Sequence, residues 1–566
     1  MRLLFALPLV FASASDTSAQ DLTDALYIKI GIDQAIVYPL PEDILVEHDF
    51  RLTLDDGVEI SMNIYRPNTT EKVPVIMSFT SYDKDMKPET YIPFTRGGIY
   101  RKIGLNLGDM TISSEALWEG ADAGFWVPNG YAVVTVDARG TGKSDGKKDP
   151  FSDKTVQGFV QAIEWASEQP WSTGKIGSTG VSYLGIIQWY IAAERPRGLV
   201  AMNVWEGLSE LLTDAAYHGG IPETAFVPFW MGGHGGHMDP NAQPRFGMTD
   251  LPKIPSIKDF TEYSIPDINV GNINVPALIT ATWSTQGLHS RGSFAGYMKL
   301  NTEKYLYTHG AEEWTVSQST EAREYQKAFF DYYLKGDESA REKLMNVRLE
   351  VRKGDEEFYV REENEWPLTN IEYKKLYLDG YNSQLVNEPL SVNTMTQYDS
   401  VNVNDEVVLS YTFDKDTEVI GYSRLKLWVS TTLGNDLDLF VGIRKIGADG
   451  KARQFWNLLQ QHEIAARGWQ RVSLRKLDAE RTSDLRPILS LDEYQPVQPA
   501  EIVSVEIEIL PYSVLFEEGS RLELILKGSD IVRSPMQQHM KLVNMGYHNI
   551  FAGKDYDSYL VLPIAN

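Results

Sequence analysis

The chain has 566 residues, 43% of them hydrophobic and none of them cysteine, and its formal net charge at pH 7 is −25. One hydrophobic core supports roughly 250–300 residues, so we expect two large domains. The negative charge argues against nucleic acid or an anionic membrane as a partner, because phosphate groups would repel it. The absence of cysteine excludes disulfides, thiol nucleophiles and cysteine–zinc sites.

The first twenty residues, MRLLFALPLVFASASDTSAQ, carry one arginine, an apolar run and small residues suited to cleavage. This is the pattern of a signal peptide, and its apolar run is too short to span a bilayer. We therefore expect residues 1–20 to be removed and the protein to be secreted or periplasmic.

Residues 40–336 show the alternation of strands and helices that is typical of an α/β domain. A hairpin around Asp56-Gly57 precedes buried strands such as VPVIMSFT (73–80), and these strands alternate with amphipathic helices. This order predicts parallel βαβ units. Between 208 and 274 the alternation gives way to Gly-, Pro-, Trp- and Met-rich sequence, which predicts an inserted, mostly helical cap whose aromatic side chains line an apolar acyl pocket.

From residue 373 to residue 566 apolar and polar residues alternate with a period of two. The segments RLKLWVS (424–430) and VSVEIEIL (503–510) are typical, and no stretch has the length or spacing of an amphipathic helix. We predict an all-β sandwich for this second domain.

The segment GKIGSTGVSYLG (174–185) combines a short strand, a serine and the start of a helix. Ser182 lies between Gly180 and Gly185, and a sharp strand-to-helix turn needs small residues at such places because its backbone is crowded. The helix that follows points its positive end at the hydroxyl group. The pattern predicts a nucleophile elbow with Ser182 as the nucleophile of a serine hydrolase.

A serine nucleophile needs a base, and on this type of sheet the base follows the last strand. His309, in KYLYTHG, occupies that position. His289 lies in a helical pattern and is interpreted as structural. His234 and His237 flank two glycines, but no further ligands cluster near them in the sequence, so we favour a cap loop over a metal site.

The oxyanion of the reaction intermediate needs hydrogen-bond donors. One donor is the backbone N–H of Tyr183, the residue after the nucleophile. A second is the phenol of Tyr82, in the loop that follows the strand 73–80.

Four segments together resemble one known family. GVSYLG, IEWASEQPWSTGKIG, VDARGTGKSDG and SYDK are similar to the cocaine esterase and X-prolyl dipeptidyl-peptidase family of α/β-hydrolases, which includes the α-amino acid ester hydrolases. The segment that begins PAEIVSVEIEIL resembles the family's C-terminal jelly-roll, galactose-binding-like domain. The resemblance implies that Ser182 is the nucleophile, His309 the base, and Tyr82 and Tyr183 the oxyanion donors, with no metal or cofactor.

The chain departs from the family pattern at the third triad member. Family members usually carry an aspartate two residues past the tryptophan of the strand VPALITATW, where this chain has Thr285. A threonine supplies no negative charge to the histidine. Glu206 is the best substitute, because it follows the neighbouring strand and so emerges at the same edge of the sheet. Glu312 and Glu313 are weaker candidates, and a Ser–His pair without an acid stays open.

These patterns predict a secreted serine hydrolase that cleaves an ester or amide through an acyl-enzyme. A peptide with proline at its second position and a carboxylic ester are both compatible substrates, and a homo-oligomer is compatible with the family. Glu210, Asp214 and Glu223 in the cap would suit a substrate ammonium, although such residues are more often solvated. The alternative function is that of a catalytically impaired homologue that binds carbohydrate or peptide.

Overall fold

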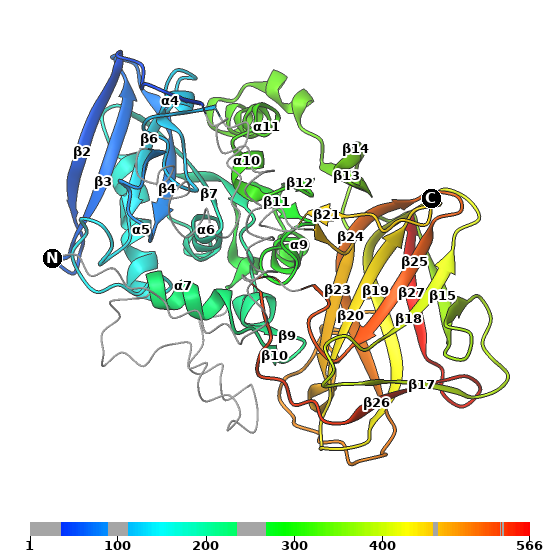
Figure 1. Ribbon diagram of the computed structural model, residues 1–566. Helices are drawn as coiled ribbons and strands as arrows, with labels where there is room; N and C mark the ends of the chain where they lie inside the picture. The colour runs from blue at the N-terminus through cyan, green and yellow to red at the C-terminus, as the bar shows by residue number, and fades with distance from the viewer. Residues whose placement is uncertain are drawn as a thin grey trace, which may run out of the picture.

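The computed structural model describes residues 36–88, 111–234, 268–456, 462–532, 534 and 537–565. Figure 1 shows an α/β part, from blue to green, beside an all-β part, from yellow to red. The predicted signal peptide, His237 and about half of the predicted cap, residues 235–267, lie outside the described residues. Within the described ranges, no helix is long and apolar enough to cross a membrane.

The α/β part is built on one sheet with the strand order β2-β3-β6-β4-β7-β8-β11-β12-β13-β14. The strands from β6 to β13 run parallel and the outer strands antiparallel, so the predicted parallel sheet and opening hairpin are confirmed. The bounds of the strands are β2 Ile44–Thr53, β3 Glu59–Pro67, β4 Val73–Thr80, β6 Ala132–Asp137, β7 Ser172–Val181, β8 Leu199–Trp205, β11 Ala277–Thr282, β12 Lys304–His309, β13 Val347–Gly354 and β14 Glu357–Glu363. A separate pair joins β1 (Ile36–Tyr38) to β5 (Thr111–Ser113).

Helices cover both faces of this sheet. Successive strand residues point to opposite faces, so Val75 and Met77 of β4 join one core and Ile76 joins the other. The first core includes residues of α5 (Asp153–Ser167), α6 (Tyr183–Ala193) and α9 (Ser290–Lys299), and the second includes residues of α4 (Ala123–Trp126) and α11 (Thr320–Phe330). A short helix, α10 (Glu313–Ser317), precedes α11, and short helical turns cover Asp331–Lys335 and Glu338–Lys343. Because both faces are covered, the central strands are continuous apolar runs.

The described part of the cap differs from the predicted, mostly helical insertion. It contains a π-helical turn (Leu212–Ala216), α7 (Phe226–His234) and a 3-10 turn (Val270–Asn272), but also a hairpin of β9 (Tyr217–His218) and β10 (Ile221–Pro222). The hairpin turn needs two successive residues with positive φ, and Gly219 and Gly220 supply φ values of 56° and 85°. The dipeptide Gly219-Gly220 was the sequence signal for this turn.

The C-terminal part has two packed antiparallel layers. One centres on β27, β19 and β24, and the other has the order β18-β25-β20-β23. The strand bounds are β15 Ile371–Asp379, β16 Gln384–Val386, β17 Thr394–Asp399, β18 Glu406–Thr412, β19 Thr417–Thr431, β20 Asp438–Ile446, β21 Phe455–Trp456, β22 His462–Glu463, β23 Ala466–Arg471, β24 Val503–Phe516, β25 Arg521–Lys527, β26 Tyr547–Ala552 and β27 Tyr559–Ala565. Apart from a 3-10 turn at Val472–Leu474, no helix occurs in the described residues after Lys343. The jelly-roll topology of this part stays a prediction.

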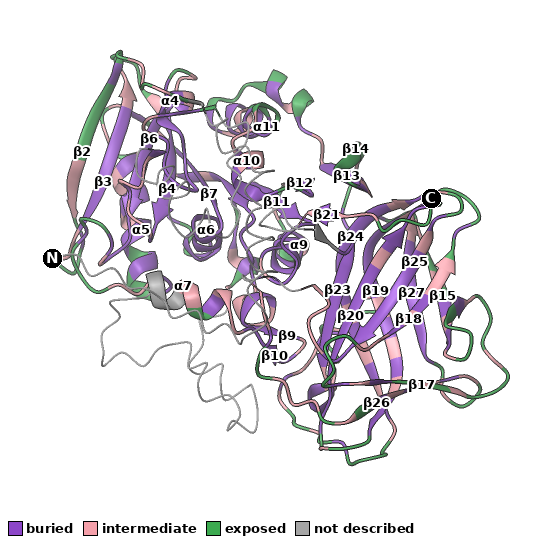
Figure 2. Ribbon diagram, viewed as in Figure 1, coloured by how far each residue is buried: buried purple, intermediate pink, exposed green. Residues whose placement is uncertain are grey.

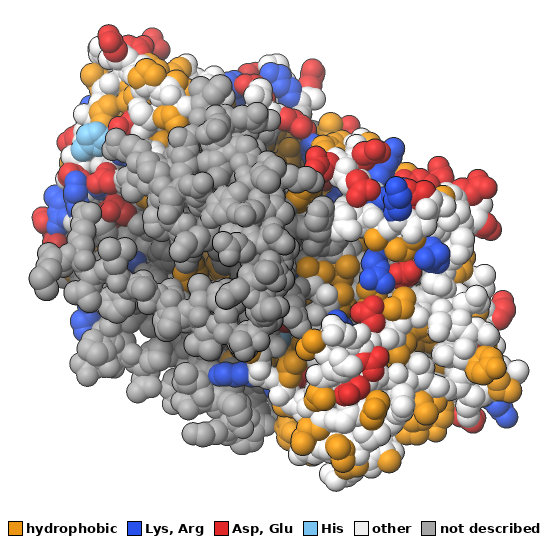
Figure 3. Space-filling view, in the orientation of Figure 1, with side chains coloured by type: hydrophobic (Ala, Val, Ile, Leu, Met, Phe, Trp, Pro, Cys, Tyr) orange, Lys and Arg blue, Asp and Glu red, His pale blue; other side chains and the backbone are white. Residues whose placement is uncertain are grey.

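The two parts are joined by backbone pairing. Strand β13 pairs with β12 of the catalytic sheet and, at Arg352, with Val514 of β24. Figure 2 shows that the strands on both sides of this junction are mostly buried. In the view of Figure 3, acidic and basic side chains are interspersed over the C-terminal part, so on this face the negative charge is not gathered in one patch.

Candidate active site

Ser182 stands between the end of β7 and the first residue of α6, as predicted. Its φ and ψ angles are 54° and −120°, values that an L-residue adopts only under strain. A Cβ atom at Gly180 would lie 2.3 Å from the Cβ of Leu184, and one at Gly185 would lie 2.8 Å from the carbonyl oxygen of Trp205. The two glycines are therefore required by close approach of the chain, and together they allow the sharp turn that presents the Ser182 hydroxyl.

Glu206 directly follows β8 and His309 is the last residue of β12, and these two strands lie on either side of β11. Oε1 of Glu206 lies 2.8 Å from Nε2 of His309, and both side chains are buried. Burial by itself would raise the pKa of the Glu206 carboxyl, but the charge and hydrogen bond of His309 lower it below its usual value. The structure thus brings the predicted base and its predicted acid into direct contact.

Thr285 occupies the place where the family pattern has an acid, and it contacts Glu206. Its hydroxyl donates a hydrogen bond of 2.9 Å to Oε2 of Glu206. Thr285 therefore cannot replace the acid itself, but it orients the carboxylate of Glu206, the predicted substitute.

The predicted nucleophile, Ser182, and the predicted base, His309, are not hydrogen-bonded to each other. In a Ser–His–acid triad, Nδ1 of the histidine usually faces the acid and Nε2 faces the hydroxyl. Here Nε2 of His309 faces Glu206, and Nδ1 is buried without a hydrogen-bond partner among the described residues. Glu206 and His309 are thus paired, whereas the Ser182 hydroxyl is not hydrogen-bonded to His309.

The two predicted oxyanion residues lie side by side. The Tyr82 hydroxyl accepts a hydrogen bond of 3.2 Å from Nε1 of Trp230, and the rings of Tyr82 and Tyr183 are 6.0 Å apart, edge to face. Tyr183 is the first residue of α6, so its backbone N–H has no acceptor within the helix. Its phenol donates to the carbonyl of Pro150 at 2.7 Å.

Glu119 is a buried carboxyl that the sequence reasoning missed. Its Oε1 accepts a hydrogen bond of 3.0 Å from Trp314, and its backbone carbonyl accepts one of 2.8 Å from Val181, next to the nucleophile. Burial raises its pKa to about 8, although hydrogen bonds from residues that include Trp314 and Tyr82 oppose the shift. The available signal was the tripeptide Trp-Glu-Gly, which occurs at 118–120 and again at 205–207, with a positive φ at both glutamates.

The two weaker candidates for the acid have other roles. The Glu312 carboxylate caps α10 by accepting the backbone N–H groups of Trp314 and Thr315. Burial and the neighbouring charge of Glu206 raise the pKa of Glu313 well above its usual value. The Oε2 atom of Glu313 lies 3.5 Å from Nε2 of His289.

A small apolar cavity of about 50 Å³ lies beside Ser182. The helix α7 of the cap contributes Phe226 and Trp230 to its lining, which agrees with the predicted aromatic lining. His289, which was interpreted as structural, also lines it. Burial lowers the pKa of His289 to about 4, so this side chain is neutral near pH 7.

The three cap carboxylates considered for a substrate ammonium are occupied by contacts within the protein. Glu210 and Asp214 form ion pairs with Arg291 at 2.9 and 2.7 Å. Glu223 accepts backbone N–H groups at the start of α7, including that of Val227 at 2.9 Å. They are neither solvated nor available for an ammonium group, because each already stabilises the cap.

Comparison with known proteins identifies the family of this chain. Residues 56–318 match the model of the X-Pro dipeptidyl-peptidase (S15 family), and residues 339–561 match that of the X-Pro dipeptidyl-peptidase C-terminal non-catalytic domain. A crystal structure of a CocE/NonD family hydrolase from Staphylococcus aureus is 39% identical, covers 92% of this chain and 94% of that chain, and superimposes with a TM-score of 0.86. The chain belongs to the CocE/NonD hydrolase family.

More distant members of the family extend the comparison. Cocaine esterase from Rhodococcus sp. is 26% identical over 392 residues, which are 59% of this CocE/NonD hydrolase and 62% of the esterase. A putative Xaa-Pro dipeptidyl-peptidase from Bacillus anthracis is 23% identical over 550 residues, or 88% of this chain and 84% of the relative. The predicted family resemblance is confirmed, and the protein is a hydrolase with an N-terminal catalytic domain and a C-terminal non-catalytic domain.

Proposed function

We propose that this protein is a serine hydrolase that cleaves carboxylic esters through an acyl-enzyme on Ser182, with His309 as the base and Glu206 as the acid. The observation that carries the proposal is the 2.8 Å contact between Glu206 and His309 at the same edge of the sheet as the strained turn at Ser182. From the sequence patterns we also propose that the protein is secreted and that its C-terminal domain has a jelly-roll fold.

The first half of the reaction forms the acyl-enzyme. The Ser182 oxygen attacks the substrate carbonyl while its proton passes to the nitrogen of His309 that does not face Glu206. This nitrogen, Nδ1, is buried and has no hydrogen-bond partner among the described residues, so it is available to accept the proton. The Tyr183 N–H and the Tyr82 phenol stabilise the oxyanion. His309 then passes the proton from Ser182 to the leaving alkoxide oxygen, which departs as an alcohol.

The second half releases the acid. Water gives one proton to His309 and attacks the acyl carbonyl, and the collapse of the intermediate returns the proton to Ser182. Glu206 keeps its negative charge throughout and stabilises the imidazolium form of His309 in both halves.

The acyl pocket favours an uncharged, apolar acyl group over an aminoacyl-proline. Its lining includes Trp230 and Phe226, and the neutral His289 offers no charge to a substrate ammonium. An ammonium group placed there would lose its hydration without a counter-charge. The described carboxylates of the cap are engaged elsewhere.

A side-by-side assay tests this preference. We expect kcat/KM for p-nitrophenyl esters to rise about fourfold for each methylene added between acetate and butyrate, because each buried methylene contributes about 0.8 kcal/mol. Trp230→Ala should flatten this series, since the substitution removes one wall of the pocket. Faster turnover of Ala-Pro-anilide than of the butyrate would contradict the ester assignment and favour a dipeptidyl-peptidase.

Labelling with a fluorophosphonate probe tests the serine chemistry itself. The expected result is one covalent label per chain, at Ser182, that is lost when the protein is unfolded before labelling. An unlabelled, folded protein would support the alternative of a homologue that only binds carbohydrate or peptide, which the preserved Glu206–His309 pair does not favour.

A further inference from the structure

The loop that follows β11 carries the residue that orients the proposed acid. Thr285 lies in this loop and donates its hydrogen bond to Glu206, and His289 at the end of the loop lines the cavity beside Ser182. The next residue after Thr285 points away from the catalytic domain. Gln286 is only 7% exposed, and its side chain is buried against the C-terminal domain.

Every hydrogen-bonding group of the Gln286 amide contacts backbone of the C-terminal domain. Its Nε2 donates to the carbonyls of Ala465 and Pro511 at 3.3 and 3.4 Å, and its Oε1 accepts the N–H of Arg467 at 3.0 Å. These three partners are backbone atoms in or next to β23 and β24, so their positions follow from the fold of the C-terminal domain.

The C-terminal domain also holds the backbone of the same loop. Nε2 of Gln537 donates to the carbonyl of Gln286 at 2.9 Å. Gly287 has a φ of +90°, and a Cβ atom there would lie 1.7 Å from Nε2 of Gln537. The approach is possible only because residue 287 is glycine.

His218 of the cap and His539 of the C-terminal domain link the carbonyl of Gly287 to Asp530. Nε2 of His218 lies 2.6 Å from this carbonyl, its Nδ1 lies 2.8 Å from Nε2 of His539, and Nδ1 of His539 lies 2.7 Å from Asp530. The backbone of the loop is thus also connected to the C-terminal domain through two buried imidazole side chains.

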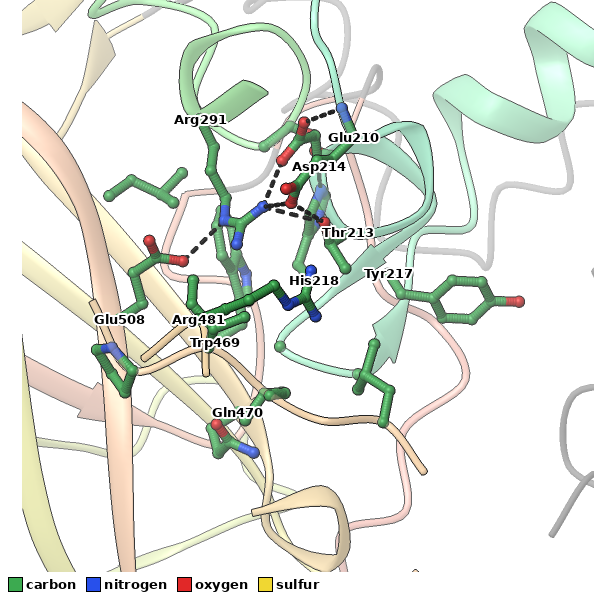
Figure 4. A pocket seen from close by; sticks show the side chains of 18 residues that line it. Glu210, Thr213, Asp214, Tyr217, His218, Arg291, Trp469, Gln470, Arg481 and Glu508 are labelled. Carbon is green, nitrogen blue, oxygen red and sulfur yellow. Dashed lines mark hydrogen bonds and ion pairs between the residues drawn. The ribbon is translucent and has the colours of Figure 1, made fainter. Parts of the chain in front are cut away.

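An ion pair anchors the far end of this segment. Arg291, in the first turn of α9, forms a 2.7 Å pair with Glu508 of β24 and a 2.7 Å pair with Asp214 of the cap. Figure 4 shows the Arg291 guanidinium between these carboxylates, beside a cavity of about 60 Å³. Residues 286–291 are thus held by the C-terminal domain at both ends.

We propose that Gln286 is a positioning residue for catalysis: the C-terminal domain holds its side chain and thereby fixes the adjoining Thr285 against the Glu206 carboxylate. The inference rests on the proposed roles of Glu206 and His309. The physical reason is that a free loop samples many backbone conformations, and only the one observed directs the Thr285 hydroxyl at Glu206. The C-terminal domain then contributes to turnover through this loop.

The variant Gln286→Met tests the proposal, because methionine has nearly the same length and makes no hydrogen bonds of this kind. We expect kcat to fall about 10²-fold, the scale of a misplacement of about 1 Å, with KM nearly unchanged. The acidic limb of the kcat/KM profile should move to lower pH, as in Glu206→Gln, because an imidazolium without an oriented carboxylate loses its proton more easily. Glu350, a further buried carboxyl whose pKa is raised by burial against the opposing charge of His309, stays in place in both variants.

A double-mutant cycle distinguishes positioning from general stability. In the Glu206→Gln background, Gln286→Met should cost less than about twofold, because the carboxylate through which it acts is gone. The control is Gln470→Met, which replaces a buried glutamine of the C-terminal domain whose amide donates to the carbonyl of Arg471, and it should leave the profile unchanged. If Gln286→Met does not fold, Gln537→Met removes the neighbouring loop contact and is judged by the same criteria.

Two results would overturn the proposal. One is a full, multiplicative loss of kcat when Gln286→Met is added to Glu206→Gln. The other is a fall in Tm with an unmoved pH profile, which indicates a structural role only. Failure of Ser182 to react with the fluorophosphonate in the wild-type protein would instead refute the proposed function, so the two failures are distinguishable.

Discussion

Replacing Ser182 with alanine should abolish turnover while leaving the fold intact. Removal of the nucleophile of a serine hydrolase lowers kcat about 10⁶-fold, because oxyanion stabilisation and substrate binding alone remain. The substitution deletes one oxygen atom of a side chain whose hydroxyl has no hydrogen-bond partner in the described structure. The thermal midpoint should therefore stay within a few degrees of the wild type, because the glycines around the turn are unchanged.

Hydrolysis of p-nitrophenyl butyrate and labelling by the fluorophosphonate measure this effect together. Ser172→Ala is the matched control, since Ser172 lies at the opposite end of β7 and only accepts the N–H of Gly174. The control should keep the wild-type rate within about twofold, as expected away from the catalytic groups. A Ser182→Ala protein that still hydrolyses the ester at an appreciable fraction of the wild-type rate would assign the nucleophile to another residue.

Replacing Glu206 with glutamine should lower kcat by about 10⁴-fold, the loss seen when the acid of a serine-protease triad is neutralised. Glutamine keeps the size of the side chain and accepts the hydrogen bond of Thr285, but it offers no negative charge to the imidazolium of His309. The labelling rate of Ser182 should fall in parallel, because the base that activates the serine is no longer oriented.

Two further variants make the test of the acid specific. Glu312→Gln changes a buried carboxyl of the same cluster that caps α10. It should alter kcat by less than about threefold, because the amide oxygen of glutamine can also accept the backbone N–H groups at the start of the helix. Adding Thr285→Asp to Glu206→Gln should restore part of the rate, since residue 285 already contacts position 206 at 2.9 Å. An unchanged kcat in Glu206→Gln would show that the acid is elsewhere or that the Ser–His pair acts alone.

Local patterns predicted the parts of the site that depend on neighbours in sequence. The turn at Ser182 follows from glycines two places before and three places after it, and the ends of β8 and β12 follow from continuous apolar runs. The pairing of Glu206 with His309 could be inferred because parallel strands present their carboxyl ends at one edge of the sheet. The described hairpin of the cap escaped prediction because only the Gly219-Gly220 dipeptide signalled it.

The buried acidic groups were beyond the reach of those patterns. Glu119 and Glu313 lie in loops and short helices, where neither a period of two nor a period of 3.6 marks a residue as buried. Their raised pKa values come from desolvation and from the charge of Glu206, and both causes depend on the packed structure. A glutamate in a sequence is by default a solvated charge.

The sequence by itself determined the family, the two-domain order, the elbow at Ser182 and the residues proposed as base and acid. Each of these depends on the pattern of one contiguous segment. Only the tertiary structure decided that Thr285 serves Glu206 and that Gln286 enters the C-terminal domain. The contacts of Gln286 cross 179 and 225 residues of chain. Such contacts form when separately encoded elements pack, and no local periodicity records which elements will meet.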